Sequence, residues 1–329
     1  MTKTNQQKVK DFLINNGVII VMFILVIYTG FTSDNFFTKN NFMNILMNMS
    51  SRLVIALGIA GCVITAGCDL SAGRMIGFGA CISGMLLQRM DYSGKFFPDM
   101  QPLNVFVVAL IAMLVCAAFG TVTGFFIAYL NVPPFIATLA MMEIVYGIGL
   151  IVTNATPLGG YVEQYTNVSN GKFLGINYLI WIAIIVAVIT WFIFNMTRHG
   201  KYMYAIGGNP QAAEVAGVPV KLTLILIYMK AAAMYGLAGF MLGAKAGGAS
   251  VQLGYGYEME AIAACTIGGV SVSGGRGKVS SAIIGVAVFE ILKAALQFLG
   301  VNSNAQWIAL GIIIFVAISL DIRKYVARK

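Results

Sequence analysis

Charged residues are scarce in this chain, and their scarcity excludes an ordinary soluble protein. Asp, Glu, Lys and Arg make up 10% of the 329 residues, whereas a typical soluble domain carries about 25%. Hydrophobic residues make up 59%, and the mean hydropathy is +0.85. The composition therefore predicts a protein that crosses a membrane several times. The net charge of +9 then reflects basic residues on one membrane face, and we expect no nucleic-acid partner.

The motifs of common enzymes are also missing. A P-loop needs the pattern G-x-x-x-x-G-K-[ST], in which backbone N–H groups hold phosphate. The pair Gly277-Lys278 fails this pattern because Val272 takes the place of the first glycine and Val279 follows the lysine. There is no H-E-x-x-H and no G-x-S-x-G, and the single histidine, His199, lies in a polar stretch. We therefore expect a protein that is not an enzyme and does not hydrolyse ATP itself.

The five cysteines show neither a metal-binding nor a disulfide pattern. No two of them form a C-x-x-C pair, and all lie in apolar runs, at Cys62, Cys68, Cys81, Cys116 and Cys265. Cysteines in such surroundings behave as small hydrophobic residues. We therefore expect no metal site and no cofactor bound by this chain.

Apolar segments alternate with polar loops along the whole sequence. They cover approximately residues 16–30, 46–66, 72–89, 104–129, 135–153, 178–195, 222–244, 258–270, 279–299 and 304–321. They predict one all-α transmembrane domain over residues 1–329, with ten membrane-spanning helices after a polar, basic tail at 1–15. The segment at 258–270 is short and contains glycine, so it either crosses the membrane or re-enters it.

Basic residues are distributed unequally between the two sides of this topology. Thirteen lysines and arginines fall on the side that includes both termini, and five fall on the other. Cytoplasmic loops of membrane proteins carry the excess of Lys and Arg, so both termini are predicted to be cytoplasmic. The polar loop at 154–177 would then face outward.

A long polar stretch, residues 196–222, interrupts the apolar pattern on the predicted cytoplasmic side. Its middle predicts a short helix at 211–216, because Asn209 can cap the first turn and Pro210 suits the first helical position. Gly217 offers a left-handed stop. At 1.5 Å per residue this helix is about 10 Å long, too short to span a bilayer. It is either a simple connecting turn or a surface on which a partner packs.

Ionisable residues within apolar segments are costly and usually face a cavity or a partner. Asp69 and Arg74 flank a glycine-containing break and can pair across a turn. Glu290 and Lys293 are three residues apart in an apolar segment and can pair on one helix face. Such pairs would be structural.

Two carboxylates, Glu258 and Glu260, stand at the start of the segment at 258–270. Two residues apart on a regular helix, they point in different directions and cannot both face one lumen. The helix dipole also favours carboxylates in a first turn, which is a purely structural reason for their presence.

Three stretches carry motifs of a known family. Ala205–Gly217 (AIGGNPQAAEVAG) resembles a cytoplasmic loop of that family, and Asp69–Arg74 (DLSAGR) resembles its D-L-S-x-G motif. Tyr257–Ala264 (YEMEAIAA) resembles its Y-E-L-D-A-I-A-A block, with Met259 and Glu260 in place of Leu and Asp. The family is that of the monosaccharide ABC-importer permeases, the ribose/galactose/xylose group. The resemblance extends over almost the whole chain and is greatest to the galactose/methyl-galactoside branch.

The resemblance implies a permease that carries a sugar across the bacterial inner (plasma) membrane. It implies a homodimer of ten-helix subunits with the vitamin-B12-permease-like architecture of type II importers. A separate ATPase that uses ATP and Mg would bind the cytoplasmic face, and a periplasmic sugar-binding protein would dock outside. The short helix would then be a coupling helix that contacts the ATPase through Gly208, Asn209, Pro210, Ala212, Ala213, Glu214 and Gly217.

Force from the ATPase would pass from the coupling helix into the adjoining segments Ile180–Asn195 and Leu222–Ala244. The candidates for the translocation path are Asp69, Ser71, Arg74, Glu258 and Glu260.

Two alternatives stay open from the sequence. Ribose permeases share most of the motifs, so the cargo would be galactose or methyl galactoside, or else ribose or another pentose or hexose. An ion-coupled secondary sugar carrier is the second alternative, although it would need several buried carboxylates linked by histidine or water. The lack of any catalytic cluster makes a membrane enzyme remote.

Overall fold

The computed structural model describes Gly17, Ile20 and residues 22–326, and the tail predicted at 1–15 lies outside the described residues. The described helices are Met22–Thr32, α2 (Lys39–Ile64), α3 (Ala72–Leu86), α4 (Val105–Tyr129), α5 (Pro134–Thr153), α6 (Glu163–Asn170), α7 (Tyr178–Met196), α8 (Arg198–Gly208), α9 (Pro210–Val215), α10 (Val220–Ala246), α11 (Tyr257–Gly268), α12 (Val279–Phe298) and α13 (Ser303–Val326). Two short strands, β1 (Lys172–Phe173) and β2 (Ile176–Asn177), form an antiparallel hairpin.

Six of the described helices are long and apolar enough to cross a membrane: α2, α4, α5, α7, α10 and α12. This confirms the prediction of a mostly helical membrane protein. Helix α11 has 12 residues, so at 1.5 Å per residue it is about 18 Å long, well short of the roughly 30 Å hydrocarbon core. Left-handed glycines bound it at both ends, Gly256 and Gly269. As a regular helix it therefore cannot cross the bilayer alone.

Helices α2 and α10 form the centre of the molecule, and α10 packs against α4, α3 and α2. Glycines permit this close packing. A Cβ at Gly120 would lie 2.5 Å from the backbone oxygen of Tyr228, and one at Gly124 would lie 2.7 Å from the Cα of Ile225. Only a small residue at these two positions lets α4 approach α10 so closely. By contrast, α4, α5 and α7 leave large apolar side chains exposed, as suits contact with lipid.

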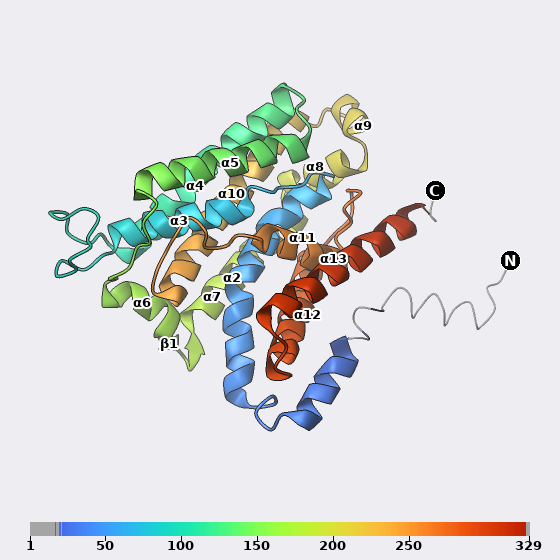
Figure 1. Ribbon diagram of the computed structural model, residues 1–329. Helices are drawn as coiled ribbons and strands as arrows, with labels where there is room; N and C mark the ends of the chain where they lie inside the picture. Colours follow the sequence, from blue (N-terminus) through green and yellow to red (C-terminus); the bar gives the residue numbers. More distant parts are fainter. Residues whose placement is uncertain (1–16, 18–19, 21, 327–329) are drawn as a thin grey trace.

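The two ends of the molecule carry different short elements. Helices α8 and α9 lie at the upper right in Figure 1, and α6 and the β1 hairpin lie at the lower left. The elements at the lower left come from the loop at 154–177, whose helix α6 the sequence did not predict. Tyr165 holds α6 in place, since its buried hydroxyl donates a hydrogen bond of 2.7 Å to the backbone oxygen of Phe240.

Candidate translocation cavity and coupling helices

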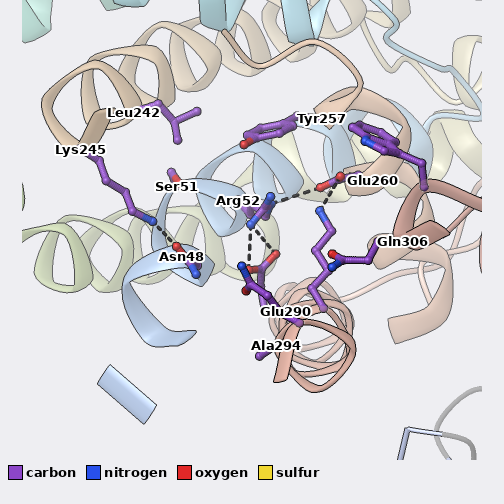
Figure 2. A pocket seen from close by; sticks show the side chains of 13 residues that line it. Asn48, Ser51, Arg52, Leu242, Lys245, Tyr257, Glu260, Glu290, Ala294 and Gln306 are labelled. Carbon is purple, nitrogen blue, oxygen red and sulfur yellow. Dashed lines mark hydrogen bonds and ion pairs between the residues drawn. The ribbon is translucent and has the colours of Figure 1, made fainter. Parts of the chain in front are cut away.

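A polar cavity of about 300 Å³ lies between α2, α10, α11, α12 and α13. Charged, amide and aromatic side chains dominate its wall: Asn48, Arg52, Lys245, Tyr257, Glu260, Glu290, Lys293, Gln297, Gln306 and Trp307. Figure 2 shows Arg52 between the carboxylates of Glu260 and Glu290. A cavity of this composition can hold a small polar solute by hydrogen bonds to its hydroxyls and by contact with an aromatic ring.

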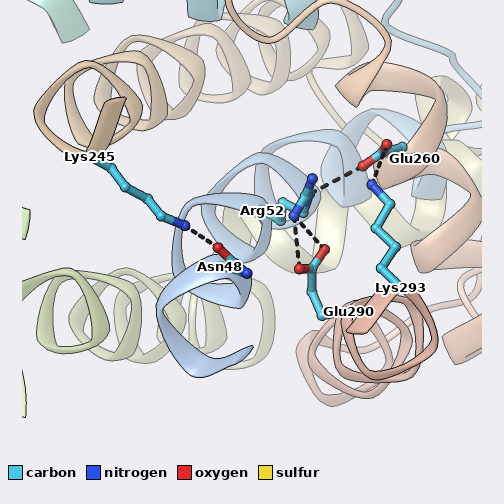
Figure 3. Close-up of polar contacts among 6 residues, drawn as sticks. All are labelled: Asn48, Arg52, Lys245, Glu260, Glu290 and Lys293. Carbon is cyan, nitrogen blue, oxygen red and sulfur yellow. Dashed lines mark hydrogen bonds and ion pairs between the residues drawn. The ribbon is translucent and has the colours of Figure 1, made fainter. Parts of the chain in front are cut away.

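An ion-pair network runs along the wall of this cavity. Arg52 Nε lies 3.2 Å from Oε2 of Glu260, and its Nη1 donates a hydrogen bond of 2.8 Å to Oε2 of Glu290. Lys293 Nζ lies 2.5 Å from Oε1 of Glu260, so one carboxylate serves two cations. Lys245 donates a hydrogen bond to Asn48 beside them (Figure 3). We call Arg52, Glu260, Glu290 and Lys293 the ion-pair network.

Arg52 of the ion-pair network lies near the middle of α2, a helix long and apolar enough to cross a membrane. Arg52 is thirteen residues from the start of α2 at Lys39 and twelve from its end at Ile64, or about 18–20 Å from each. Charges at such depth are costly unless they pair or line a water-filled cavity. Both conditions hold here, because the carboxylates of Glu260 and Glu290 are paired and the wall of the cavity is polar.

The predicted path residues separate into two groups. Glu260 faces the cavity. Glu258 faces α3 instead, where a Cβ placed on Gly73 would lie 2.1 Å from its Oε2. In this structure the two carboxylates therefore do not line the same cavity. Asp69, Ser71 and Arg74 do not line the described cavity either.

The expected Asp69–Arg74 pair is wrong. Asp69 Oδ1 accepts hydrogen bonds from the backbone N–H and hydroxyl of Ser71, at 3.0 and 2.6 Å. Its Oδ2 accepts one of 3.1 Å from Tyr235. Arg74 turns away and donates a hydrogen bond of 2.7 Å to Gln252. Backbone and hydroxyl donors satisfy Asp69 without an ion pair. The Arg74 guanidinium lies over the rings of Tyr146 and Tyr255, and its Nε has no hydrogen-bond partner among the described residues.

The expected Glu290–Lys293 pair is wrong as well. Lys293 pairs with Glu260 on α11, and Glu290 pairs with Arg52 on α2. Spacing along one helix predicts a pair only when no better partner lies on a neighbouring helix. The side chain that sequence reasoning missed is Arg52; its signal was an arginine in the middle of an apolar segment.

On the opposite side of the molecule, α9 confirms the predicted short helix. Asn209 caps it, since its side-chain oxygen accepts a hydrogen bond of 3.0 Å from the backbone N–H of Ala212. Pro210 occupies the first turn, and Gly217 follows with a left-handed φ of 82°. The helix projects from the bundle, and the Val215 side chain at its end is 90% exposed. An apolar residue so exposed on a short helix suits contact with a partner.

The seven predicted contact residues lie at the end of α8, on α9 and in the turn that follows: Gly208, Asn209, Pro210, Ala212, Ala213, Glu214 and Gly217. All but Ala213 are exposed. Ala213 is buried and holds α9 against the bundle. Six of the seven are therefore accessible to a partner.

Helix α8 was not predicted, and it joins α9 to the bundle. Its glycine Gly207 fits so tightly that a Cβ there would lie 1.8 Å from the backbone oxygen of Ile64 at the end of α2. The Tyr204 hydroxyl donates a hydrogen bond of 2.8 Å to the backbone oxygen of Gly277, in the break before α12. The signal in the sequence was Thr197, which caps α8 by accepting from the N–H of Gly200. Helix α8 therefore contacts both the end of α2 and the segment that leads into α12.

The single histidine lies on α8. Burial, together with the nearby positive charge of Lys230, lowers the pKa of His199 to about 4. The ring is therefore neutral at physiological pH.

A bundle of apolar helices with an internal polar cavity and a short helix that projects from one end has the architecture of a membrane transport permease. Residues 41–317 match the family described as "Branched-chain amino acid transport system / permease component", and the chain belongs to this family. It is 40% identical, over all of both chains, to the galactose/methyl galactoside import permease proteins of Escherichia coli and Haemophilus influenzae. It is 32% identical to the ribose import permease protein of Escherichia coli, over 96% of each chain. No solved structure matches the chain.

Proposed function

We propose that this chain is the membrane-spanning permease subunit of an ABC importer that carries galactose or methyl galactoside into the cytoplasm. The observation that carries the proposal is the 40% identity, over the full length of both chains, with permeases named for that cargo. The weaker likeness to ribose permeases makes ribose the second candidate cargo. Initial rates of uptake of radiolabelled galactose and ribose by the assembled transporter decide between the two sugars.

The energy for transport would come from a separate ATPase subunit. The chain lacks a P-loop, so ATP and Mg would be bound by the partner and no cofactor by this chain. Helix α9 would insert into a groove of that ATPase, with the exposed Val215 and Glu214 in contact with it. A periplasmic sugar-binding protein would dock on the opposite side, near α6 and the β1 hairpin.

The assembly in the membrane would contain two copies of this chain. Each copy would cross the bacterial inner membrane with ten segments, among them the short α3 and α11, and α11 would complete its crossing only together with non-helical residues next to it. Both termini would be cytoplasmic. The excess of Lys and Arg on the side of α8 and α9 supports this orientation.

Movement of α9 would reach the membrane helices through α8. Helix α8 packs against α7, α10 and α2, and Tyr204 ties it to the break before α12. A displacement of α8 would therefore act on the end of α2 and on the start of α12 together. It would also act on α7 and α10, the two helices that adjoin the loop in sequence.

Substitutions on the exposed face of α9 test the coupling role. We expect Glu214→Arg and Gly208→Trp to abolish galactose uptake, because each places a misfitting side chain at the ATPase contact. Both variants should insert normally, since Glu214 is exposed and a Cβ at Gly208 meets nothing within 4 Å. Uptake assays and co-purification of the ATPase measure the effect. Normal uptake and normal ATPase binding by both variants would rule out the coupling role.

Substitutions at two adjacent glycines distinguish binding of the ATPase from transmission of its movement through α8 to the membrane helices. Gly207→Ala places a Cβ against the backbone of Ile64, whereas Gly208→Ala adds one in open space. We expect Gly207→Ala to reduce galactose-stimulated ATP hydrolysis and uptake together, and Gly208→Ala to leave both near the native level. Equal effects of the two substitutions would remove α8 from the transmission path.

Labelling of single cysteines tests the orientation. The tip of the β1 hairpin, Leu174, is 78% exposed, and Val215 is 90% exposed at the other end. Ser169 is a poor site for such a tag, because it is buried and its hydroxyl donates to the backbone oxygen of Ala244. We expect a membrane-impermeant maleimide to label Leu174→Cys in intact cells and Val215→Cys only after permeabilisation. The reverse pattern would invert the topology.

A further inference from the structure

Four polar and aromatic side chains meet on an outer face of the subunit. Arg74 lies in the first turn of α3, Tyr146 is on α5, and Gln252 and Tyr255 belong to the non-helical stretch between α10 and α11. Gln252 is exposed and Tyr255 is 58% exposed, whereas Arg74 and Tyr146 are half-buried. We call these four residues the arginine–tyrosine cluster. Its side chains are accessible from outside the subunit.

The four side chains of the arginine–tyrosine cluster hold one another in place. The guanidinium carbon of Arg74 lies 4.0 Å from the centre of the Tyr146 ring and 4.6 Å from the centre of the Tyr255 ring. Its Nη1 donates a hydrogen bond of 2.7 Å to the side-chain oxygen of Gln252. The Nε2 of Gln252 donates one of 2.8 Å to the Tyr146 hydroxyl. Cation–π contacts and hydrogen bonds together therefore fix the long Arg74 side chain.

The cluster keeps hydrogen-bonding groups free for a ligand. The Tyr146 hydroxyl accepts from Gln252 and still has its own proton to donate. The Tyr255 hydroxyl has no hydrogen-bond partner among the described residues, and of the Arg74 nitrogens only Nη1 donates there. Aromatic rings with a few fixed polar groups are the combination that binds small polar ligands. The cluster can therefore bind an uncharged, polyhydroxylated molecule.

The cluster lies at membrane depth. Tyr146 is twelve residues from the start of α5 at Pro134 and seven from its end at Thr153, or about 18 Å and about 10 Å along the helix. Helix α5 is long and apolar enough to cross a membrane. Non-helical backbone and a charged side chain at such depth are tolerated only against protein or water. The face that carries the cluster is therefore not a lipid-facing surface.

Neighbouring positions on α5 extend this polar face. Glu143 precedes Tyr146 by three residues, so it lies on the same side of the helix, and it is exposed as well. A Cβ at Gly147 would meet nothing within 4 Å, so the helix leaves open space beside Tyr146. A second copy of the chain can cover such a face and still leave room for water and solute.

We propose that the arginine–tyrosine clusters of two copies face each other across the axis of the assembly and together form the sugar-binding surface of the transport path. This inference rests on the proposed function, from which it takes the two copies and the sugar cargo. A twofold axis places a surface of one copy opposite the same surface of the other. Each cluster covers one side of the sugar, so the site is complete only when two copies assemble.

Each side chain has its own role at this site. The exposed ring of Tyr255 contacts the apolar face of the sugar, and Arg74 and the Tyr146 hydroxyl donate hydrogen bonds to sugar hydroxyls. Gln252 is a positioning residue, because it holds Arg74 and Tyr146 through one amide group.

Removal of the Tyr255 ring tests contact with the sugar. Galactose uptake and ATP hydrolysis stimulated by the galactose-loaded binding protein are measured on the assembled transporter in proteoliposomes. We expect Tyr255→Ala to lower uptake about tenfold, which corresponds to about 1.4 kcal/mol. Tyr255→Phe keeps the ring and should retain most of the uptake. ATP hydrolysis should stay near the native level in both variants, because neither substitution alters α8 or α9.

Tyr129→Ala is the matched control for loss of an exposed tyrosine. Tyr129 is 49% exposed at the end of α4, and Lys221 lies over its ring. This variant should transport galactose at the native rate. Native uptake by Tyr255→Ala would overturn the inference, and so would a fall of its ATP hydrolysis in step with uptake, which would indicate a structural role.

Gln252→Ala provides a second variant that should fold, since Gln252 is exposed. We expect it to lower galactose uptake several-fold while ATP hydrolysis stays near the native level, because Arg74 and Tyr146 lose their common partner. Native uptake by Gln252→Ala would contradict the positioning role.

Thiol labelling tests whether the cluster faces water. In a Cys68→Ser background the remaining native cysteines are buried. A charged methanethiosulfonate is supplied on both sides of the membrane during turnover. We expect it to modify Tyr255→Cys, because thiols react as thiolates, which form in water. Ile185→Cys, at a 55% exposed position on the apolar helix α7, should resist it. Equal resistance of the two variants would overturn the inference.

The native transporter separates this inference from the proposed function. If the unsubstituted complex accumulates neither galactose nor ribose with ATP present, the proposed function fails. If it accumulates sugar while Tyr255→Ala and Gln252→Ala transport at the native rate, only the arginine–tyrosine cluster loses its role.

Discussion

Helix α11 carries a buried carboxylate on each of two sides, and the surroundings of the two carboxylates differ. Glu258 and Glu260 are both in its first turn and are 4% and 5% exposed. Glu260 accepts from two cations and lines a polar cavity. Glu258 packs against Gly73 on α3, and its Oε2 has no hydrogen-bond partner among the described residues. Two residues of similar burial therefore have separate roles.

The difference shows that burial alone does not identify a carboxylate that lines a polar cavity. The helix dipole favours any carboxylate in the first turn of α11, and this is the reason available for Glu258. Glu260 shares that advantage but also binds Arg52 and Lys293 across the cavity. A polar cavity and partners on other helices are what distinguish Glu260, which lines that cavity, from Glu258, which only packs.

Removal of the Glu260 charge should have the largest effect. Glu260→Gln leaves Arg52 and Lys293 near mid-membrane with Glu290 alone. Loss of one partner of a buried ion pair costs roughly 3–5 kcal/mol. The cations are 19% and 17% exposed, so we expect the lower end, about 3 kcal/mol. The melting temperature in detergent and galactose uptake should both fall.

The matched substitution on the other side is Glu258→Gln. Its Oε2 makes no hydrogen bond that an amide would lose, so we expect a change in unfolding free energy within about 1 kcal/mol. Equal loss of stability and uptake in the two glutamine variants would erase the distinction between the two sides of α11.

Gly73→Ala tests the packing role of Glu258 with a smaller expected effect. The new Cβ would lie 2.1 Å from Glu258 Oε2 and 2.8 Å from the backbone oxygen of Gly254. Overpacking of this kind costs about 1–3 kcal/mol, so the melting temperature should fall. Gly147→Ala is the control, since a Cβ there meets nothing within 4 Å.

A second substitution sharpens this test. Glu258→Ala should restore part of the stability that Gly73→Ala removes, because it takes away the nearest clashing atom. If the double variant is less stable than the sum of the two single effects predicts, Glu258 does more than pack against α3.

Arg52→Lys should have a smaller effect than Glu260→Gln. Arginine reaches Glu260 through Nε and Glu290 through Nη1, whereas a lysine keeps the charge but lacks the planar fork. We expect a loss of about 1 kcal/mol, the contribution of one hydrogen bond, with uptake reduced but measurable. Native stability and uptake in Arg52→Lys would mean that charge alone, and not the bridge between two helices, matters here.

Much of the fold could be predicted from the sequence because apolar segments and helix caps are local signals. Asn209 and Pro210 locate the start of α9 correctly, and Gly217 its end. Helix α8 was missed because its buried residues, such as Met203 and Ile206, are few and stand among polar ones. Helix α6 was missed for a similar reason, since it is held mainly by Tyr165.

The candidate cavity could be predicted only in part. Glu260 was found because two carboxylates in one short segment are conspicuous. The surroundings of Arg52 and of the asparagines of α2 could not be predicted, because they depend on α11 and α12 lying beside α2 in the folded chain. The wrong pairs, Asp69–Arg74 and Glu290–Lys293, have the same cause, because sequence spacing cannot show which neighbouring helix offers a better partner.

The most direct test of the central claim is uptake of labelled galactose by proteoliposomes of defined composition. With this chain, its ATPase and its sugar-binding protein, we predict accumulation of galactose. This accumulation should require ATP on the side of the membrane where the ATPase is bound, and it should survive an uncoupler. With this chain alone under an ion gradient, we predict none. Concentrative uptake by the chain alone would contradict the account.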